Sequence, residues 1–384
     1  MSARLGYYEF FCGGGMARAA LNGSPWRCLF ANDIDPRKTR AYADNWGDDS
    51  LRTADVGTLR PRDLPGRAAL VWASFPCQDL SLAGPGAGLA GARSGVFWPF
   101  WSLIEGLVAE KRAPRVIALE NVLGALSAHG GQDFTAICAA LCGAGYTIGA
   151  LAVDAALFLP QSRPRLFIIG VRHDTPFSAA LTDEHPHCLW APPGLRAAYD
   201  RLPSPLRSRW RWWRLPAPSP RSLRLSDLLE DNPPDVRWQS PEETAQLLAM
   251  MSDCQLKKIE DARLCGAPTF GTLYKRTRCD ASGRKIQRAE VRFDGIAGCL
   301  RTPAGGSSRQ RILSVTGDCV RSRLLSSREA ARLMGLPDVY RLPPRYNEAY
   351  HLLGDGVAVP VVDHLARHLL QPLLQGHHVA SDAA

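Results

Sequence analysis

The chain has 384 residues, a formal net charge of +9 and 46% hydrophobic residues, so it can bury a large core and a smaller domain beside it. No run of about 18 uncharged apolar residues occurs, which excludes a membrane-spanning helix. The first residues include Glu9 and no cleavage site, so no secretory signal is expected. Eleven cysteines without a C-x-x-C pair favour free thiols in a reducing compartment, and no zinc-like spacing occurs, so we expect no metal.

Strand-like and helix-like segments alternate over the first part of the chain. We expect strands at Leu5–Phe11, Trp26–Asp33, Ala68–Phe75, Arg115–Asn121, Tyr146–Ala156 and Arg165–Arg172. We expect helices at Met16–Gly23, Pro36–Trp46, Gly95–Lys111 and Asp133–Gly145. This alternation predicts an α/β fold with a doubly wound, mostly parallel sheet.

The periodicity is lost at His173 and returns near residue 324. Between them the chain is rich in Pro, Arg and Trp, and Pro241–Met251 is the clearest helical segment. A capping box opens the segment Ser326–Pro337, and Val357–Leu374 has apolar residues on one helical face. We therefore predict a discontinuous domain of residues 1–172 plus 324–375, a smaller irregular lobe of residues 173–323 and a disordered tail at 376–384.

A basic segment lies within that middle region. Leu195–Leu225 has eight arginines and one acidic residue, and three tryptophans are interleaved with the arginines in Arg207–Leu215. A solvated charged face is one interpretation, but exposed indoles are costly. Arginine with aromatic residues is typical of proteins that bind phosphates and stack on bases, so the segment favours nucleic acid.

Glycines follow the first predicted strand. The sequence GGGMAR lacks the third glycine of G-x-G-x-x-G, which disfavours a pyrophosphate ligand, whereas Asp33 lies 20 residues past Gly13 at the end of the second strand. A carboxylate there binds ribose hydroxyls in doubly wound folds. A ligand with adenine and ribose but no pyrophosphate, such as S-adenosylmethionine, fits both features. The alternative is a tight turn followed by a helix-capping acid.

Reactive side chains follow the later strands. Cys77 comes after Pro76 at the tip of one strand, and Glu120 ends the next. Arg163 and Arg165 are two residues apart on one side of an extended chain. Because ligands bind at the carboxyl ends of such strands, we expect a thiol, a carboxyl group and two guanidinium groups to converge there. A buried, inert Cys77 is the alternative.

The motifs EFFCGGG, NDID, ADV, FPCQDLS, ENV, QSRPR, SSREAARLMGLPD and LLGDGVAVPVV occur in this order. They cover Tyr7–Arg172 and Leu324–Leu374, and this ordered set resembles the bacterial-type cytosine-5 DNA methyltransferases. The resemblance implies that residues 173–323 form the family's variable target-recognition lobe. One departure is that Asp355 and Gly356 replace the family's usual Asn-Ser.

The resemblance implies methyl transfer from S-adenosylmethionine to carbon 5 of a flipped-out cytosine in a specific double-stranded DNA sequence, with S-adenosylhomocysteine as product. Carbon 5 of cytosine is a poor nucleophile, and addition of the Cys77 thiolate at carbon 6 turns the ring into an enamine. A protonated Glu120 would offset charge at ring nitrogen 3. Arg163 and Arg165 would stabilise charge near the carbonyl and hold phosphates. Flipping is required because this chemistry cannot occur inside a base stack.

The resemblance also implies which residues contact the ligands. The cofactor-binding residues would be Phe11, Gly13, Gly15, Asp33 on the ribose, Ile34 on the adenine face, Asp55 on the adenine amino group, Phe75, Pro76, Asp355 and Val357. The DNA-binding residues would include Ser81, Gln161 and, in the glycine-rich loop Gly84–Ser94, Arg93.

The middle lobe should divide its contacts with DNA between two segments. Arginines of Arg207–Arg224, among them Arg209 and Arg211, are expected to meet phosphates. Val291–Arg311 suits base reading, because its glycines permit close approach and its polar side chains can pair with base edges. The candidates in this second segment are Arg301, Thr302, Ser307, Ser308, Arg309 and Gln310. A flexible surface loop is the alternative.

The expected partner is double-stranded DNA, and we expect no membrane. The protein is predicted to be monomeric, cytoplasmic and nucleoid-associated, either with a companion restriction endonuclease or as an orphan methyltransferase. Two alternatives within the same superfamily are a transfer-RNA cytosine-5 methyltransferase and an inactive DNA-binding relative. A nicotinamide dehydrogenase is disfavoured because GGGMAR is a poor phosphate-binding loop.

Overall fold

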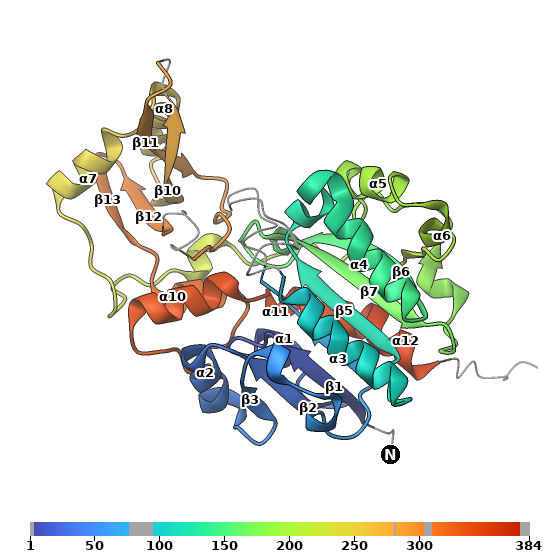
Figure 1. Cartoon of the computed structure of the whole chain (residues 1–384). Coiled ribbons are helices and arrows are strands. Elements are labelled where there is room, and N and C mark those ends of the chain that lie inside the picture. The colour runs from blue at the N-terminus through green and yellow to red at the C-terminus, as the bar shows by residue number, and fades with distance from the viewer. Residues whose placement is uncertain (1–3, 77–94, 280–281, 303–308, 377–384) are drawn as a thin grey trace, which may run out of the picture. The chain divides into compact units, whose positions relative to one another are not determined.

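The computed structural model describes residues 4–76, 95–279, 282–302 and 309–376, and its contacts divide the chain into two units (Figure 1). The first unit contains Met1–Asp154, Pro164–Ser219 and Val359–Ala384. The second contains Ala155–Arg163 and Pro220–Ala358. Contacts thus group residues 173–219 with the first unit and 324–358 with the second. The division into functional domains stays a prediction, and the expected tail lies outside the described residues from residue 377 onward.

A mixed sheet organises the first unit. Its described strands have the order β3-β2-β1-β4-β5-β7-β6. β7 is antiparallel to both of its neighbours, β5 and β6, and the other neighbouring pairs are parallel. The predicted mostly parallel sheet is therefore confirmed. The strands are β1 (Leu5–Phe10), β2 (Trp26–Asp33), β3 (Leu51–Thr53), β4 (Leu70–Ala73), β5 (Val116–Asn121), β6 (Tyr146–Asp154) and β7 (Pro164–Arg172).

The parallel strands define two edges of this sheet. Phe10, Asp33, Ala73 and Asn121 end β1, β2, β4 and β5, and because these strands are parallel they end at one edge, which we call the carboxyl edge. The opposite, amino edge contains the first residues of the same strands. In folds of this kind ligands bind beyond the carboxyl edge.

Helices cover the sheet on both faces. On one face, alternate residues of the strands, such as Tyr8, Val71 and Ile117, share a buried cluster with Phe100 and Ile137 from the helices. In Figure 1, α3 and α4 lie in front of the strands, and α11 lies on the other side, where it contacts α1. The helices are α1 (Met16–Ala20), α2 (Pro36–Trp46), α3 (Phe97–Ala109), α4 (Gln132–Gly143), α11 (Val359–Leu365) and α12 (Gln371–Gln375), with a π-helical turn at Ala366–Leu370.

Local sequence accounts for several of these elements. Pro36 occupies the first turn of α2, and the side chain of Asp35 accepts a hydrogen bond from the backbone N–H of Arg37 at 2.8 Å, so the helix begins where the sequence predicts. Every residue of β5 is buried, which explains why its sequence is a continuous apolar run up to Glu120. Val361 and Leu365 of the last helical segment are buried on the predicted face.

The tryptophan-rich segment adds an edge to the sheet of the first unit. The backbone of Arg209 and Arg211 bonds to Ile148 of β6, and Trp210, Trp212 and Trp213 are buried. The interpretation of these tryptophans as base-stacking side chains is therefore wrong, because all three indoles are buried, whereas Arg209, Arg211 and Arg214 are exposed. The neighbouring elements are β8 (Thr182–Asp183), α5 (Pro193–Asp200), α6 (Ser204–Arg207) and β9 (Trp212–Trp213).

The second unit contains an antiparallel sheet with described strands in the order β11-β10-β12-β13. It buries Leu273, Val291 and Leu313 against Leu247 and Ile259 of two helices. The smaller lobe is confirmed, but it is more regular than the sequence suggested. Its strands are β10 (Thr269–Cys279), β11 (Lys285–Arg292), β12 (Arg311–Thr316) and β13 (Cys319–Leu324), and its helices are α7 (Pro241–Leu248), α8 (Asp253–Leu264), α9 (Ser327–Leu333) and α10 (Tyr346–Asp355).

A buried ion pair joins β13 to α9 within this unit. Ser326 and Glu329 form the predicted capping box at the start of α9, and the Glu329 carboxylate also accepts two hydrogen bonds from Arg323 at 2.6 and 2.7 Å.

None of the described helices is both long and apolar enough to span a bilayer.

Candidate active site

The candidate site lies at the carboxyl edge of the first unit's sheet. Asn121, the last residue of β5, donates a side-chain hydrogen bond to the carbonyl oxygen of Phe75 at 3.3 Å. This bond connects the ends of two neighbouring strands just before Pro76. Cys77, Ser81 and Arg93 lie outside the described residues, so their predicted roles stay predictions.

Glu120 and Arg165 form an ion pair at this edge. The distance between Arg165 Nε and Glu120 Oε1 is 3.1 Å, and both side chains are largely buried. Glu120 pairs with Phe167 across β5 and β7, so Arg165, two residues earlier on the same face of β7, lies diagonally opposite Glu120. The structure thus brings together two of the four predicted catalytic side chains.

Arg163 belongs to the second unit and is only 2% exposed. Its guanidinium group donates to the carbonyl oxygens of Leu300 and Gly354, both at 2.8 Å, and to that of Gly356. These bonds connect the predicted base-reading segment to the GDGV motif. The described contacts of Arg163 are therefore structural, and its contact with the base stays a prediction.

The glycine-rich turn follows β1 directly. Phe11 has a φ of 56°, a conformation that is costly for a bulky residue and is found mainly at functional sites. Gly13 has a φ of 54°, and a Cβ atom there would meet no described atom within 4 Å. At Gly15 a Cβ atom would lie 2.4 Å from Trp46 Nε1. The backbone of the turn is therefore open at Gly13 and packed closely against Trp46 at Gly15.

Asp33 and Ile34 flank this turn at the end of β2. One carboxylate oxygen of Asp33 accepts a hydrogen bond from the backbone N–H of Gly13, and the other accepts one from Asp35, both at 2.9 Å. Each oxygen keeps a second lone pair for a ligand hydroxyl. Ile34 is 64% exposed, an unusual position for an isoleucine beside a buried carboxylate. Asp55, also exposed, accepts from the backbone N–H of Gly57 at 2.8 Å.

These features fit a nucleoside ligand such as the adenosyl part of S-adenosylmethionine. Open backbone at Gly13, a carboxylate aligned by that backbone and an exposed apolar side chain at Ile34 match a polar sugar and a flat apolar base.

In the second unit, Val357 is buried and Asp355 is exposed, and a Cβ atom at Gly354 would lie 3.0 Å from the backbone of Arg301 and Thr302.

A buried carboxyl group precedes the turn, and the sequence alone did not single it out. Glu9 of β1 is 1% exposed, and burial raises its pKa to about 8, although the neighbouring Arg18 opposes the shift. Burial likewise raises the pKa of the Cys12 thiol. An acidic residue inside the apolar run of the first strand was the available signal. Cys12 is consequently a protonated, packed thiol, unsuited to nucleophilic chemistry.

Comparison with known proteins decides the family. The family model described as C-5 cytosine-specific DNA methylase matches residues 5–371. This chain belongs to that family. The type II methyltransferase M.BsuFI of Bacillus subtilis is 25% identical over 378 residues, which cover 97% of this chain and 74% of that protein. The type II methyltransferase M.HhaI of Haemophilus parahaemolyticus is 25% identical over 370 residues, 95% of this chain and 94% of that protein.

Solved structures support the fold. The Entamoeba histolytica methyltransferase EhMeth has a TM-score of 0.64 at 13% identity, with 97% of this chain and 99% of that chain covered. The Dnmt2 methyltransferase of S. pombe has a TM-score of 0.56 at 18% identity, with 96% and 99% covered. These structures confirm the predicted fold, whereas the family model and the curated relatives confirm the predicted family, which fits S-adenosylmethionine-dependent methylation of DNA at carbon 5 of cytosine.

The predicted phosphate contacts of the methylase lie away from the candidate active site. Arg209 and Arg211 are exposed and bracket Ile148, near the start of β6, whereas Arg165 pairs with Val153 near the end of that strand. Five residues of strand correspond to about 17 Å. Both arginines are therefore nearer the amino edge than the Glu120–Arg165 pair, and their contact with DNA stays a prediction.

The predicted base-reading residues of the methylase differ in accessibility. Arg301 is exposed and Thr302 is half-buried. Arg309 is half-buried and donates to Asn347 Oδ1 at 2.6 Å. Gln310 is 4% exposed, so its side chain has very little surface for a base edge. Ser307 and Ser308 lie outside the described residues.

Gln161 was predicted to contact DNA, and the structure does not support this. Its side chain has no exposed surface, donates to the carbonyl oxygen of Leu333 at 2.6 Å and accepts from the backbone N–H of Leu300 at 3.2 Å. Gln161 therefore connects α9 to the irregular segment at Leu300. Its polar character suggested a ligand contact, but the sequence could not reveal these distant backbone partners.

Proposed function

We propose that the methylase acts on cytosine flipped out of a specific double-stranded DNA sequence, through a covalent bond between Cys77 and carbon 6. The observation that carries this proposal is the Glu120–Arg165 pair, 3.1 Å apart at the carboxyl edge of the sheet. Asn121 bonds to Phe75 in the adjacent segment, two residues before Cys77. A carboxyl group, a guanidinium group and the described residues that lead to Cys77 therefore lie at the same edge of the sheet, which supports the proposal.

Each side chain has a distinct task in this reaction. The Cys77 thiolate forms a bond to carbon 6, and the electron pair of the C5–C6 double bond moves toward ring nitrogen 3 and the carbonyl. Glu120 offsets this charge by a proton at nitrogen 3. Arg165 positions the Glu120 carboxyl group and stabilises charge near the carbonyl. After methylation a base removes the proton from carbon 5, and the bond between carbon 6 and sulfur breaks.

The cofactor in this proposal is S-adenosylmethionine. Asp33 would hold the ribose hydroxyls, Ile34 would cover the adenine, and the turn from Phe11 to Gly15 would approach the amino-acid part. Bound there, the cofactor supplies an electrophilic methyl group on a sulfonium sulfur and leaves as S-adenosylhomocysteine. The exposed Ile34 and the open backbone at Gly13 support this arrangement.

The relatives are named type II methyltransferases, which supports a role in restriction and modification. We infer that the methylase marks DNA against a companion endonuclease, that it acts as a monomer, and that it works at the nucleoid in the cytoplasm, where its DNA substrate lies.

The deciding experiment is a covalent trap. The protein should transfer tritiated methyl groups from S-adenosylmethionine to duplex DNA rather than to transfer RNA, and should form a stable adduct with duplex containing 5-fluorocytosine. Cys77→Ala should abolish both, because a methyl side chain cannot add to carbon 6, while DNA binding survives. Cys188→Ala removes an exposed thiol elsewhere and should leave both unchanged. Substantial turnover by Cys77→Ala would refute the mechanism.

A further inference from the structure

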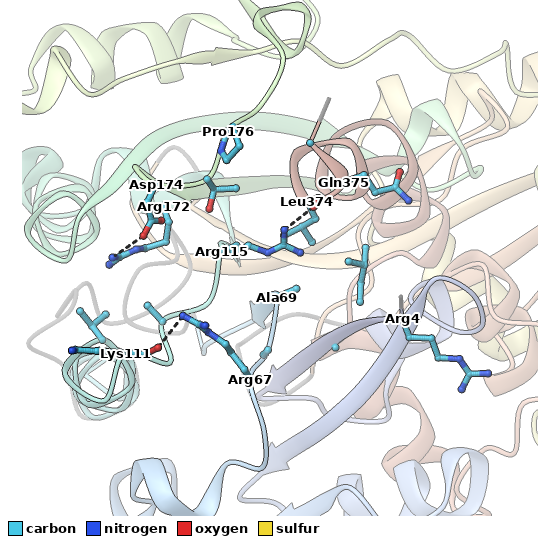
Figure 2. Close-up of a pocket in the computed structure, with 17 residues that line it drawn as sticks. Arg4, Arg67, Ala69, Lys111, Arg115, Arg172, Asp174, Pro176, Leu374 and Gln375 are labelled. Atoms are coloured by element: carbon cyan, nitrogen blue, oxygen red, sulfur yellow. Dashed lines mark hydrogen bonds and ion pairs between the residues drawn. The ribbon is translucent and has the colours of Figure 1, made fainter. Parts of the chain in front are cut away.

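A positively charged pocket lies at the amino edge of the first unit's sheet. It has a volume of about 820 Å³ and lies where β1, β4 and β5 begin and β7 ends (Figure 2). Five cationic side chains and one carboxylate are among its lining residues, an excess of four positive charges. The charged residues are Arg4, Arg67, Lys111, Arg115, Arg172 and Asp174.

Part of this charge has a structural explanation. Arg67 donates to the carbonyl oxygen of Lys111 at 2.9 Å, just past the end of α3, and Arg115 donates to that of Leu374 at 2.8 Å in α12. Cationic groups are favourable at helix carboxyl ends, where carbonyl oxygens lack partners. The distance between Arg172 Nη2 and Asp174 Oδ2 is 3.6 Å, so these two charges offset one another.

The remaining charge has no such explanation. Each of these carbonyl bonds uses one N–H of a guanidinium group that carries five. No ion pair of the described residues involves Arg4, Arg67, Lys111 or Arg115. Partial burial, and then the positive charge of Arg67, lower the pKa of Arg115, the direction expected where like charges face one another without a counter-ion.

We propose that this pocket binds phosphate groups at a site separate from the cytosine-binding edge. Phosphate oxygens match guanidinium groups in charge and geometry, and Lys111 adds a point charge beside them. Along β5, Glu120 lies five residue steps past the pocket residue Arg115, which corresponds to about 17 Å. The pocket is also of a size typical for small ligands, and its lining includes apolar residues such as Leu5, Val108 and Leu374.

The phosphate could belong to a free phosphorylated molecule or to the backbone of a DNA segment, and two probes distinguish them. Inorganic tripolyphosphate, titrated by calorimetry, represents the free molecule. A fluorescent duplex of A·T pairs only, followed by anisotropy at several salt concentrations, represents DNA that cannot be methylated. This site does not depend on the catalytic assignment, so either can fail without the other.

The test compares pocket variants of the full chain with a charge-matched control. Arg67→Gln/Arg115→Gln removes two pocket charges, and Lys111→Gln removes a side chain with no described bond, so that variant should fold normally. Arg40→Gln/Arg52→Gln removes two exposed charges outside the pocket. Thermal unfolding verifies that all variants fold.

We expect the pocket variants to bind at least one probe about tenfold more weakly, the scale of losing a charge-assisted hydrogen bond, with the control unchanged. If the duplex is affected, its salt-dependence slope should also fall by about 0.9 for each phosphate that is no longer neutralised, and DNA is the source. If only tripolyphosphate is affected, a free phosphorylated molecule is the source. Equal binding of both probes by pocket variants and control would overturn the proposal.

Discussion

At the scale of single residues, the Glu120–Arg165 pair should separate binding from chemistry. Glu120→Gln keeps the side-chain shape but removes the proton that offsets charge on the ring. We expect turnover to fall by about 10²- to 10⁴-fold, the usual contribution of general acid–base catalysis, with little change in DNA affinity. Single-turnover methylation and DNA titrations measure the two quantities. Equal losses of rate and affinity would make Glu120 a binding or structural residue.

Glu9 should make stability depend on pH. Burial raises its pKa from 4.5 to about 8 in the folded protein. The folded state therefore holds a proton that the unfolded chain has released over this range, so stability falls as pH rises from about 4.5 to 8, by at most about 1.4 kcal/mol per pH unit. Glu9→Gln, which mimics the protonated form, should flatten the pH profile of urea unfolding. An unchanged slope would contradict the assignment.

The positions of some site residues could be predicted from the sequence, whereas the contacts of others could not. Glu120 and Arg165 could be placed near one another because strand ends in a parallel sheet share an edge, a rule that uses only the order of elements. The hydrogen-bond partners of Arg163 and Gln161 could not be predicted, because they are backbone groups more than 100 residues away in sequence. The sequence also gave no sign that the boundary between the two units falls between Arg163 and Arg165, which are only two residues apart.

At the scale of elements, predictions succeeded where the apolar pattern was continuous. β2 and α2 have the predicted bounds, because a parallel strand with a buried second half and a proline-initiated, capped helix both have strong local signals. β10 and β11 were missed. Their outer halves are charged and exposed, as at Arg276, Arg278 and Lys285, and this hides the period-two alternation.

Gly149 should be essential for attachment of the tryptophan-rich segment to β6. A Cβ atom at this position would lie 2.1 Å from the carbonyl oxygen of Arg211 and 2.5 Å from Trp213 Nε1. Since the first of these atoms belongs to the backbone, Gly149→Ala must displace the segment and expose buried indoles. We expect a loss of about 1–3 kcal/mol or more in the free energy of unfolding, the range for overpacked cores. Urea unfolding and tryptophan fluorescence measure it.

Gly143 provides the matched control for this prediction. It is the last residue of α4 in the same unit, and a Cβ atom there would meet no described atom within 4 Å. Gly143→Ala should therefore leave stability unchanged or raise it slightly, because alanine favours helix. Comparable losses in the two variants would show that the close approach at Gly149 is unimportant.

At the scale of the whole molecule, exposed arginines with different expected roles occur in both units. Arg209 and Arg211 belong to the first unit, on the added edge beside β6. Arg301 belongs to the second, and its backbone packs against Gly354 of the GDGV motif, while Arg163 bonds to the carbonyl oxygens of Leu300 and Gly354. A firmly held backbone with an exposed side chain suits base reading better than a loosely attached loop.

These two sets should therefore affect DNA recognition differently. Arg301→Ala should relax the target sequence at one base pair by about 1–3 kcal/mol, because a guanidinium group pairs with a guanine edge in two places. Arg209→Ala should instead weaken binding to all sequences similarly and reduce the salt-dependence slope by about 0.9, as expected when one phosphate is no longer neutralised. Methylome sequencing of cells that express each variant measures the first effect, and titration of unrelated duplexes at several salt concentrations measures the second. An unaltered methylated motif with Arg301→Ala would place the reading surface elsewhere in the second unit, and an unchanged slope with Arg209→Ala would remove the added edge from the DNA interface.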